Sequence, residues 1–401
     1  MIRPSFRKRR AEARTIPQVL LLIEASTAYG RAILEGVGRY VHEHGPWSIY
    51  FEERGQEDPP PRWIGNWRGD GIISRTATPA MDRWLKAICL PTVELLGNRA
   101  VSPAKVHGDN VAGGRLAAEH LLSSGLRHFA FFSFGDAWWI DALREGFREA
   151  LSAAEHSLHV YQQTSRGKGL VPHWKHSHQS RVIGWLRALP QPVGIFTPSN
   201  SDARYVMNVC REIGFAVPEQ VAVLGADEDP AICSVSTPPL SSIDWDSARI
   251  GYQAAALLDR MMAGERPPRE VLWIPPVRVV VRQSTDIVAI DDADVAQAVR
   301  FIREHALQDI DVVDVAVSVG LSRRVLERRF RQYLGRTPKD EIMRVRVDQA
   351  RLLLAHTVMS VETISRKSGF PCFRHFARIF RSQTGVTPRV YRQAYRVPPD
   401  A

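Results

Sequence analysis

The sequence predicts a two-lobed α/β domain followed by a smaller all-helical domain. Between residues 18 and 282, short apolar segments alternate with segments of helical spacing. This alternation is typical of parallel sheets that are covered by helices on both faces. From Val295 onward every segment has helical spacing. The charge changes as well, because residues 318–401 carry 18 Lys and Arg against 6 Asp and Glu, a net charge of +12.

The α/β part spans about 265 residues, which is too long for one sheet of ordinary size and fits two lobes. Ligands of such sheets bind beyond the carboxyl ends of the strands. The predicted strands start at Gln18, Gly69, His128, Val193 and Gln220, and a β-rich segment from Val271 to Asp286 closes the domain. The predicted helices are Arg31–His44, Val111–Ser124, Ile140–Ser152, Asp202–Ile213 and Asp246–Met262.

These patterns divide the chain into four parts: a basic tail (1–16), a two-lobed domain (17–285), an acidic linker (286–294) and a helical domain (295–401). No apolar run approaches the ~20 residues that span a bilayer, and "VLLLI" is too short for a signal-peptide core. The four cysteines are widely spaced and fit a reducing compartment. We therefore expect a cytoplasmic, nucleoid-associated protein without a membrane partner.

The helical domain contains one basic unit twice, "VLERRFRQYLGRTP" from Val325 and "HFARIFRSQTGVTP" from His375. A tight turn at Gly320 or Gly369 precedes each unit, and this predicts two helix-turn-helix elements. In each copy a glycine is positioned to cap the second helix, and Thr-Pro then begins the next one. The segment "RVRVDQARLLLAHT" is expected to form a rigid helix that holds both elements about one DNA turn apart.

The second helix of each element has an apolar face and an arginine face. Leu326 and Phe330, like Phe376 and Phe380, are four residues apart and predicted to face the core. The arginines on the opposite side could form a solvated surface, but guanidinium groups also bind guanine or phosphate. A basic C-terminal end on a mildly acidic body favours double-stranded DNA as the partner.

The stretch Val312–Arg392, with its signature "GF…FARIFRSQTGVTPRVYR", resembles the AraC-type DNA-binding domain. At Phe373 the resemblance implies a contact with a thymine methyl group, although the ring could equally pack in the core. The resemblance also implies which residues of the two second helices face the DNA bases, and they include both neutral and charged side chains. These residues are Arg323, Arg324, Glu327 and Arg328 in the first copy, and Phe373, Arg374, His375 and Arg378 in the second.

The body resembles the periplasmic-binding-protein-like core of LacI/GalR-type repressors. The resemblance rests on "GDNVAGGRLAAEHLLSSGLRHFAFFS", "NSDARYVMNVCREIGFAVPEQVAVLGADED" and "PPLSSIDWDSARIGYQAAALLDRMMAGE". Those repressors carry their DNA-binding module at the N-terminus, and the inverted order here resembles the xylose operon regulators, which are pentose-responsive activators. The resemblance implies that a sugar binds between the lobes and repositions the helix-turn-helix elements on operator DNA. A homodimer and a contact with RNA polymerase are further expectations.

Sugar sites combine carboxylates or arginines for the hydroxyl groups with an aromatic face for the ring. Asp202 could contact the sugar or only cap a helix, and Trp139 and Trp245 could stack on the sugar or pack in the core. Leu143 stands where many of these cores carry an arginine, which leaves the identity of the sugar open. The candidate ligand-binding residues are Asp227, Asp202, Arg75, Trp139, Trp245 and Tyr29.

Other chemistry is not indicated. His173, His176 and His178 have no known metal-ligand spacing and no nearby acidic partner, so neither a metal nor another cofactor is expected. No acid/base pair or nucleophile motif stands out, and the protein is not expected to be an enzyme. The alternative is a sugar-binding protein or a sugar-active enzyme with a basic C-terminal tail, from which sequence-preferring DNA binding would distinguish this chain.

Overall fold

The structure is a computed structural model that describes residues 16–395 except 56–57, 59–60, 76–78, 89, 97–103, 164–175, 269 and 288–291. The predicted basic tail therefore lies outside the described residues, apart from Ile16. The chain divides into two compact units, in which unit 1 comprises Met1–His107 with Ser247–Trp273 and unit 2 comprises Gly108–Asp246 with Ile274–Ala401. Within the described residues no helix combines the length and the apolar character needed to cross a membrane.

The described strands of unit 1 form a six-stranded sheet in the order β11-β5-β4-β3-β1-β2. The pairs from β2 through β5 are parallel. The strands are β1 (Gln18–Leu22), β2 (Ser48–Phe51), β3 (Gly71–Ser74), β4 (Thr92–Glu94), β5 (Ala104–Gly108) and β11 (Leu272–Ile274). The helices are α1 (Ala28–His44), η1 (Arg62–Asn66), α2 (Pro79–Ile88) and α8 (Ser247–Met262).

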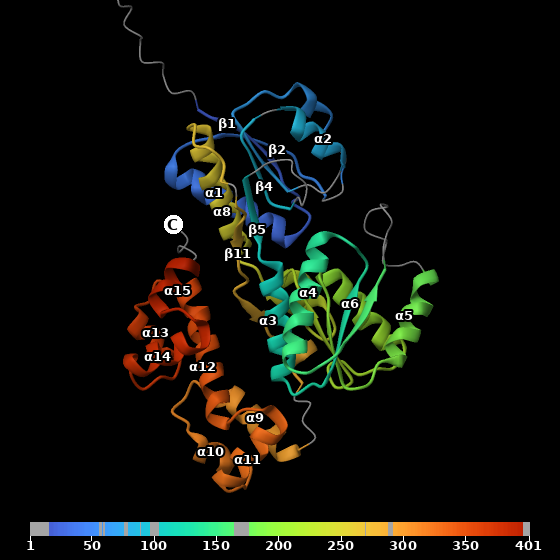
Figure 1. Ribbon diagram of the computed structural model, residues 1–401, viewed down its shortest axis with the longest axis vertical. Coiled ribbons are helices and arrows are strands. Elements are labelled where there is room, and N and C mark those ends of the chain that lie inside the picture. The colour runs from blue at the N-terminus through green and yellow to red at the C-terminus, as the bar shows by residue number, and fades with distance from the viewer. Residues whose placement is uncertain are drawn as a thin grey trace, which may run out of the picture. The chain divides into compact units, whose positions relative to one another are not determined.

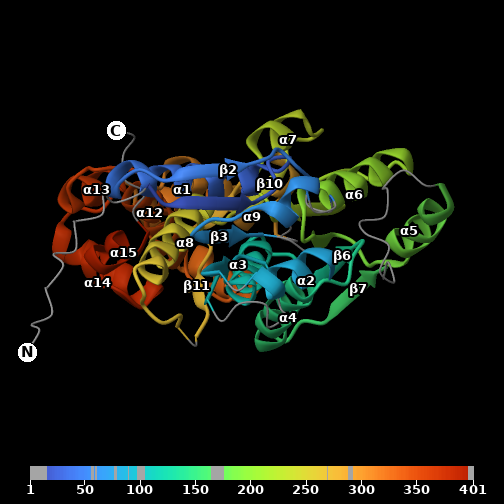
Figure 2. The ribbon, with the colours of Figure 1, turned by 90° about the horizontal axis from the view of Figure 1, so that it is seen from above.

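Helices α1 and α8 lie side by side (Figures 1 and 2) although more than 200 residues separate them. A glycine on each helix permits this approach, since a Cβ on Gly36 would lie 1.8 Å from the carbonyl oxygen of Ala248. A Cβ on Gly251 would lie 2.0 Å from the carbonyl oxygen of Ile33. Unit 1 is therefore completed by a segment from late in the chain.

The described strands of unit 2 also form a six-stranded sheet, in the order β12-β10-β9-β8-β6-β7. All pairs are parallel except β10 with β12, which is antiparallel. The strands are β6 (His128–Ser133), β7 (Leu158–Gln162), β8 (Val193–Phe196), β9 (Val221–Gly225), β10 (Ser241–Asp244) and β12 (Arg278–Val280). The helices are α3 (Asn110–Ser123), α4 (Trp138–Ala153), α5 (His176–Ala188), α6 (Asn200–Glu212), α7 (Pro230–Val235) and η2 (Gln283–Thr285).

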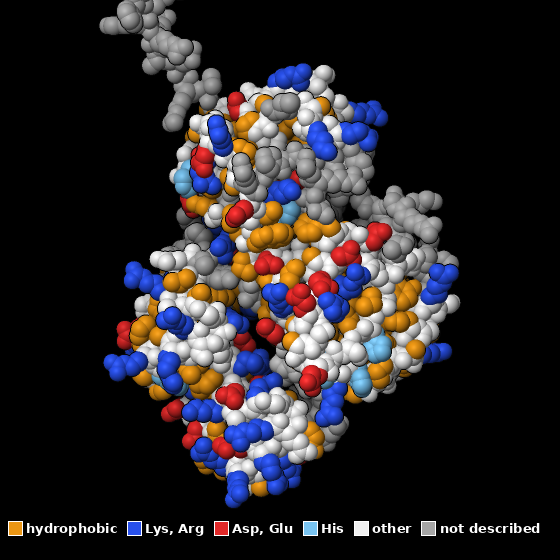
Figure 3. Space-filling model, in the orientation of Figure 1, with side chains coloured by type: hydrophobic (Ala, Val, Ile, Leu, Met, Phe, Trp, Pro, Cys, Tyr) orange, Lys and Arg blue, Asp and Glu red, His pale blue; other side chains and the backbone are white. Residues whose placement is uncertain are grey.

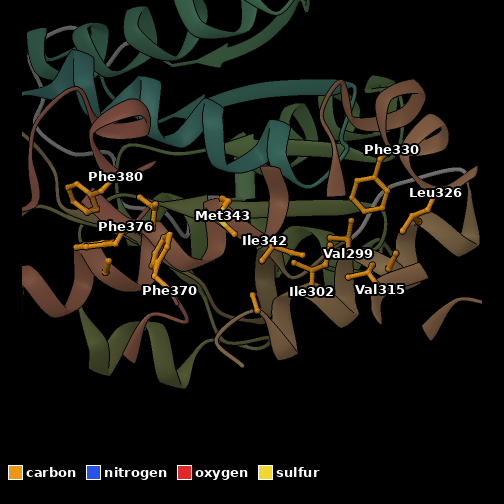
Figure 4. Packing of buried hydrophobic residues seen from close by; sticks show 14 of the residues in the cluster. Val299, Ile302, Val315, Leu326, Phe330, Ile342, Met343, Phe370, Phe376 and Phe380 are labelled. Atoms are coloured by element: carbon orange, nitrogen blue, oxygen red, sulfur yellow. The ribbon is translucent and has the colours of Figure 1, made fainter. Parts of the chain in front are cut away.

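The rest of unit 2 is a helical domain whose described helices are connected by short turns. They are α9 (Ala293–His305), α10 (Val312–Ser318), α11 (Arg323–Leu334), α12 (Pro338–His356), α13 (Val361–Lys367), α14 (Phe373–Thr384) and α15 (Pro388–Tyr395). Its core is one continuous cluster. Figure 4 shows Leu326 and Phe330 at one end of the cluster and Phe376 and Phe380 at the other. Side chains of α12 lie between the two groups.

The predicted fold class is confirmed, because two α/β units with mainly parallel sheets precede an all-helical domain. The five strands predicted from apolar segments are β1, β3, β6, β8 and β9, and the five predicted helices match α1, α3, α4, α6 and α8 within three residues at each end. Helix α9 begins at Ala293, within the segment assigned to the linker. The four domain boundaries stay a prediction.

Candidate nucleic-acid interface and ligand site

Helix α11 has the two faces that its spacing predicts. Leu326 and Phe330 are fully buried. Arg324 and Arg328, by contrast, are exposed and lie four residues apart on one side. Arg323 is also exposed, and its Nε donates a hydrogen bond of 2.8 Å to Oε1 of Glu327. This pair orients the first turn of the helix, so that α11 presents three guanidinium groups and one carboxylate outward.

Helix α14 repeats this arrangement with a different set of side chains. Phe376 and Phe380 are fully buried, whereas Arg374 and Arg378 are exposed. Phe373 is 48% exposed, and its ring centroid lies 6.3 Å from that of Phe376. The ring of Phe373 is therefore accessible at the start of the helix and is not part of the core.

His375 is half-buried beside these arginines. Burial lowers its pKa first, and the positive charges of Arg378, Lys339 and Arg346 lower it further. The lowered pKa favours the neutral imidazole, in which one ring nitrogen donates a hydrogen bond and the other accepts one. Such a group could bind either a donor or an acceptor on a base edge.

The backbone at the turns matches the sequence prediction. Gly320 and Gly369 have φ values of 67° and 76°, in the left-handed region that turns of this kind require. Gly335 and Gly385 cap α11 and α14 with φ values of 66° and 77°. Thr337 then caps α12 with Pro at the first helical position. Because both copies share these caps, each recognition helix has a defined end and a defined exit direction.

Helix α12 connects the two elements over 19 residues, which corresponds to about 28 Å at 1.5 Å per residue. Arg346 fixes this helix to the first element. Its buried guanidinium donates to the carbonyl oxygens of Ala306 at 2.7 Å, Gln308 at 2.9 Å and Ile310 at 3.2 Å. These carbonyls follow the end of α9, where helical partners are missing. Sequence spacing did not identify this role.

Arg329 has a different role from its neighbours on α11. Its Nη1 lies 3.0 Å from Oδ2 of Asp292 and 2.9 Å from Oδ2 of Asp294, at the start of α9. Asp292 also caps α9, with its side chain accepting from the amides of Asp294 and Val295. The arginines of "RRVLERRF" are therefore divided, since three point outward and one ties the helix to its domain.

Figure 3 shows Lys and Arg side chains gathered over the part of the surface where Figure 1 places α9–α11. Arg323, Arg324 and Arg328 of α11 are exposed. Exposed Lys and Arg side chains on a helix-turn-helix element fit binding to the phosphate backbone of DNA.

In the α/β part of unit 2, candidate ligand residues lie at the carboxyl ends of neighbouring strands. Asp227 follows β9, and its Oδ2 accepts a hydrogen bond of 3.2 Å from the amide of Asn200 after β8. Asp202 is 5% exposed. Burial raises the pKa of Asp202 to about 7, with a smaller contribution from the charge of Asp227. A carboxyl group that is partly protonated near pH 7 can both donate and accept hydrogen bonds, as sugar hydroxyls do.

The structure distinguishes the two candidate tryptophans. Trp245 is 6% exposed, its indole N–H donates to the carbonyl oxygen of Ala226, and its ring packs against Gly113. These contacts favour the packing alternative for Trp245. Trp139 is half-buried in the first turn of α4. Leu143, on the same helix, is 1% exposed and contributes no polar group.

Leu143 is followed directly by an arginine, Arg144, on the same helix α4. Its Nη2 lies 3.0 Å from Oδ1 of Asp141, and it also donates to the side chain of Gln162 at the end of β7. The side-chain amide of Gln162 donates in turn to the carbonyl oxygen of Gly135 at 2.9 Å. Sequence reasoning did not include Arg144, whose partner Gln162 lies 18 residues further along the chain.

In unit 1, polar side chains likewise collect at the carboxyl ends of the strands. Arg75 follows β3 and forms an ion pair with the buried carboxylate of Glu24, which follows β1. The guanidinium of Arg75 lies 4.6 Å from the ring centroid of Tyr29 in a cation–π contact. His107 at the end of β5 is buried, and burial, together with the charges of Lys105 and Arg75, lowers its pKa to about 4. This edge is charged and hydrogen-bonding, as a polar ligand requires.

The three-histidine segment is largely outside the described residues, since His173 and the side chains of His176 and His178 are not described. Among the residues that the structure does describe, no group of three or more His, Cys, Asp or Glu side chains is arranged to hold a metal ion.

Three domain families match the chain. An XylR N-terminal domain matches residues 18–104, a periplasmic binding protein-like domain matches residues 118–285, and a helix-turn-helix domain matches residues 315–394. A binding-protein-like sensor joined to two helix-turn-helix elements defines a transcriptional regulator that responds to a small ligand. The predicted AraC-type and LacI-like parts are thereby confirmed at the level of the fold.

Relatives that match nearly the whole chain show to which family of transcriptional regulators it belongs. The chain is 34% identical over 387 residues to the xylose operon regulatory protein of Escherichia coli K12, and the match covers 94% of this chain and 96% of that protein. It is 29% identical over 386 residues to the corresponding protein of Haemophilus influenzae, with 94% and 98% coverage. The chain belongs to the family of xylose operon regulatory proteins. A solved structure titled a xylose-binding transcription activator, XylR, has a TM-score of 0.60 and 31% identity and covers 96% of this chain and 100% of that one.

Proposed function

We propose that this chain is a pentose-responsive transcriptional activator and that its effector is xylose. The observation that carries the proposal is the pairing of two features in one chain: outward-facing arginines on both recognition helices, and polar strand ends in both α/β sheets. Relatives named for the xylose operon, including a xylose-binding activator, support the choice of sugar. The protein acts by binding and not by catalysis.

The DNA contacts proposed from the sequence lie on α11 and α14, and all of them are exposed or half-buried: Arg323, Arg324, Glu327, Arg328, Phe373, Arg374, His375 and Arg378. The sugar contacts proposed are Asp227, Asp202 and Trp139 in unit 2 and Arg75 and Tyr29 in unit 1. For Trp245, the other candidate from the sequence, burial and the bond to Ala226 favour packing over stacking on the sugar. Two copies of the chain bind two half-sites as a homodimer in the cytoplasm, on the nucleoid, and contact RNA polymerase from there. Repeated recognition helices in each copy fit such an extended operator.

Replacing Arg324 or Arg378 with alanine is expected to weaken DNA binding by about 1–3 kcal/mol at one base position, because each loses a bidentate contact to a guanine. The measurement is the affinity of the full chain for a duplex selected from a random pool by the wild-type protein with xylose, and for its single-base variants. Arg148→Ala removes an exposed arginine of α4 and serves as the control.

A uniform loss for all sequences, together with a salt dependence reduced by about one unit of slope, would identify the arginine as a phosphate contact. No loss at all would exclude the residue from the interface.

Replacing Asp227 with asparagine is expected to weaken xylose binding, because a hydrogen bond to a carboxylate is worth about 1.5–3 kcal/mol, or about 10- to 150-fold in affinity. Titration calorimetry with xylose on the full chain measures this loss directly. The matched control is Asp309→Asn, which removes an exposed carboxylate from the loop after α9. If Asp227→Asn bound xylose as tightly as the control did, Asp227 would not be a ligand residue.

A further inference from the structure

Glu228 and Arg282 form an ion pair that belongs to neither proposed binding surface. Nη2 of Arg282 lies 2.5 Å from Oε1 of Glu228, and its Nη1 lies 3.0 Å from Oε2. The two side chains are only 19% and 15% exposed. This two-bond geometry fixes both position and direction, and partial burial protects it from screening by salt.

On one side, the pair is tied to the proposed sugar residue Asp227, which directly precedes Glu228. The amide of Glu228 donates to Oγ of Ser242 at 2.9 Å, and this hydroxyl donates to Oδ1 of Asn200 at 2.8 Å. The amide of Asn200 donates back to Oδ2 of Asp227 at 3.2 Å. Because these bonds form a closed loop, Asp227 and Glu228 cannot shift independently of each other.

The backbone conformation of Glu228 also indicates that this segment is held in place by its contacts. Its φ is 36°, in the left-handed region that side chains with a Cβ rarely adopt. Such a conformation persists only where several contacts hold it, and it is often found where a segment has to change state. Here the contacts are the ion pair to Arg282 and the hydrogen bond that the backbone amide of Glu228 donates to Oγ of Ser242.

On the other side, the pair is tied to the segment that enters the helical domain. The amide of Arg282 donates to Oγ of Ser241 at 2.8 Å, and its carbonyl accepts from the same hydroxyl at 2.9 Å. Arg282 directly precedes η2, in which Thr285 lies 2.9 Å from Nε2 of His120 on α3. Asp286 then contacts Arg303 of α9 at 3.4 Å.

The junction around Arg282 leaves room for movement. A cleft of about 810 Å³ that is open to solvent lies between α3, β12 and helices α9 and α12, and Arg282, Asp286, Arg303 and Arg344 are among its lining residues. Polar contacts between Asp286 and Arg303, and between Arg336 and Ser123, connect the helical domain to the α/β part of unit 2.

We propose that the Glu228–Arg282 ion pair couples sugar binding at Asp227 to the position of the DNA-binding domain. This inference rests on the proposed function. Both residues are positioning residues, since neither contacts sugar or DNA. A coupling element of this kind changes the response of one site to the other and leaves each separate affinity nearly intact.

The test uses the full chain and the variants Glu228→Gln and Arg282→Lys, which retain the size of the side chains. The affinity for the duplex selected by the wild type is measured with and without xylose, and the affinity for xylose is measured by calorimetry. We expect the wild-type response to xylose to be about 5- to 150-fold in DNA affinity. In both variants the response should fall to within about twofold while xylose binds within about threefold of wild type.

The double variant should be no worse than either single variant, because the two residues act through one another. The control is Glu149→Gln, which removes the carboxylate of an exposed pair with Arg115 on α3 and α4. Either a full response in both variants or additive losses in the double variant would overturn the proposed coupling. A wild-type chain that fails to bind xylose would instead overturn the proposed function, and the coupling with it. Thermal melts identify a variant that does not fold, in which case the other single variant decides.

Discussion

Replacing Phe380 with alanine is expected to destabilise the second helix-turn-helix element by about 3–5 kcal/mol, the usual cost of removing a fully buried phenylalanine from a packed core. Phe380 is fully buried and makes edge contacts to Phe376, at a centroid distance of 5.4 Å, and to Tyr391, at 5.3 Å. Its ring therefore holds α14 against α15. The cavity left behind is expected to release the end of α14.

Amide hydrogen exchange followed by mass spectrometry on the full chain measures this effect locally. Peptides from α13–α15 should exchange much faster in Phe380→Ala, while peptides from the sheets should not change. Phe373→Ala is the matched control, because it removes the same ring from the same helix at a position that is 48% exposed. Equal effects of the two substitutions would contradict the assignment of Phe380 to the core.

Replacing Glu341 with glutamine is expected to cost about 3–5 kcal/mol, the usual cost of breaking a buried ion pair from one side. The side chain of Glu341 is 0% exposed. It accepts from Nε of Arg336 at 2.7 Å and from Nη2 of Arg344 at 2.7 Å. A neutral amide in its place leaves both guanidinium groups without their shared counter-charge. Arg336 also donates to the carbonyl oxygen of Ser123 at 2.9 Å, so the loss should reach α3 as well.

The same carboxylate predicts a pH dependence. Burial by itself would raise the pKa of Glu341, but Arg344, then Arg336 and Arg303, outweigh burial and lower the pKa from 4.5 to about 2. The folded state therefore holds the proton less tightly than the unfolded state does. The resulting stability, on the order of 3 kcal/mol, is fully present above pH 4.5 and is lost as the pH falls towards 2.

Hydrogen exchange of α12 peptides at pH 7 and pH 3 tests both expectations. The wild type should lose protection in α12 between these values, and Glu341→Gln should lose less because its stabilising charge is already gone. Asp309→Asn, which removes an exposed carboxylate of the same domain, should follow the wild type. A variant with the wild-type pH dependence would show that Glu341 does not contribute to acid sensitivity.

The spacing of apolar residues predicted those strands and helices whose secondary structure is determined by a local sequence pattern. The buried strands β1, β6 and β9 are continuous apolar runs, and the doubled unit with its glycine caps predicted α11 and α14 closely. Strand β2 carries no such signal, because Ser48–Phe51 is exposed along its whole length at the edge of the sheet. Short strands such as β4, with three residues, are too brief to show any period.

The side chains that hold the sites in place were less predictable than the sites themselves. Arg329 and Arg346 read as two more basic residues of a positive segment, yet their partners lie 35–40 residues away in sequence. Glu228 and Arg282 are 54 residues apart. Composition and spacing describe a residue's immediate neighbours in the chain. Contacts between residues so far apart in sequence depend on which elements the folded chain brings together.

The discontinuous build of unit 1 sets an order for synthesis on the ribosome. Helix α1 is made early, but its partner α8 begins only at Ser247, after the whole first section of unit 2 (Gly108–Asp246) has been translated. Until then the face of α1 around Gly36 has no cover, and the sheet of unit 1 lacks its edge strand β11. The helical domain emerges last of all. During translation, the segments of both α/β sheets are therefore complete before the helix-turn-helix elements of the helical domain are made.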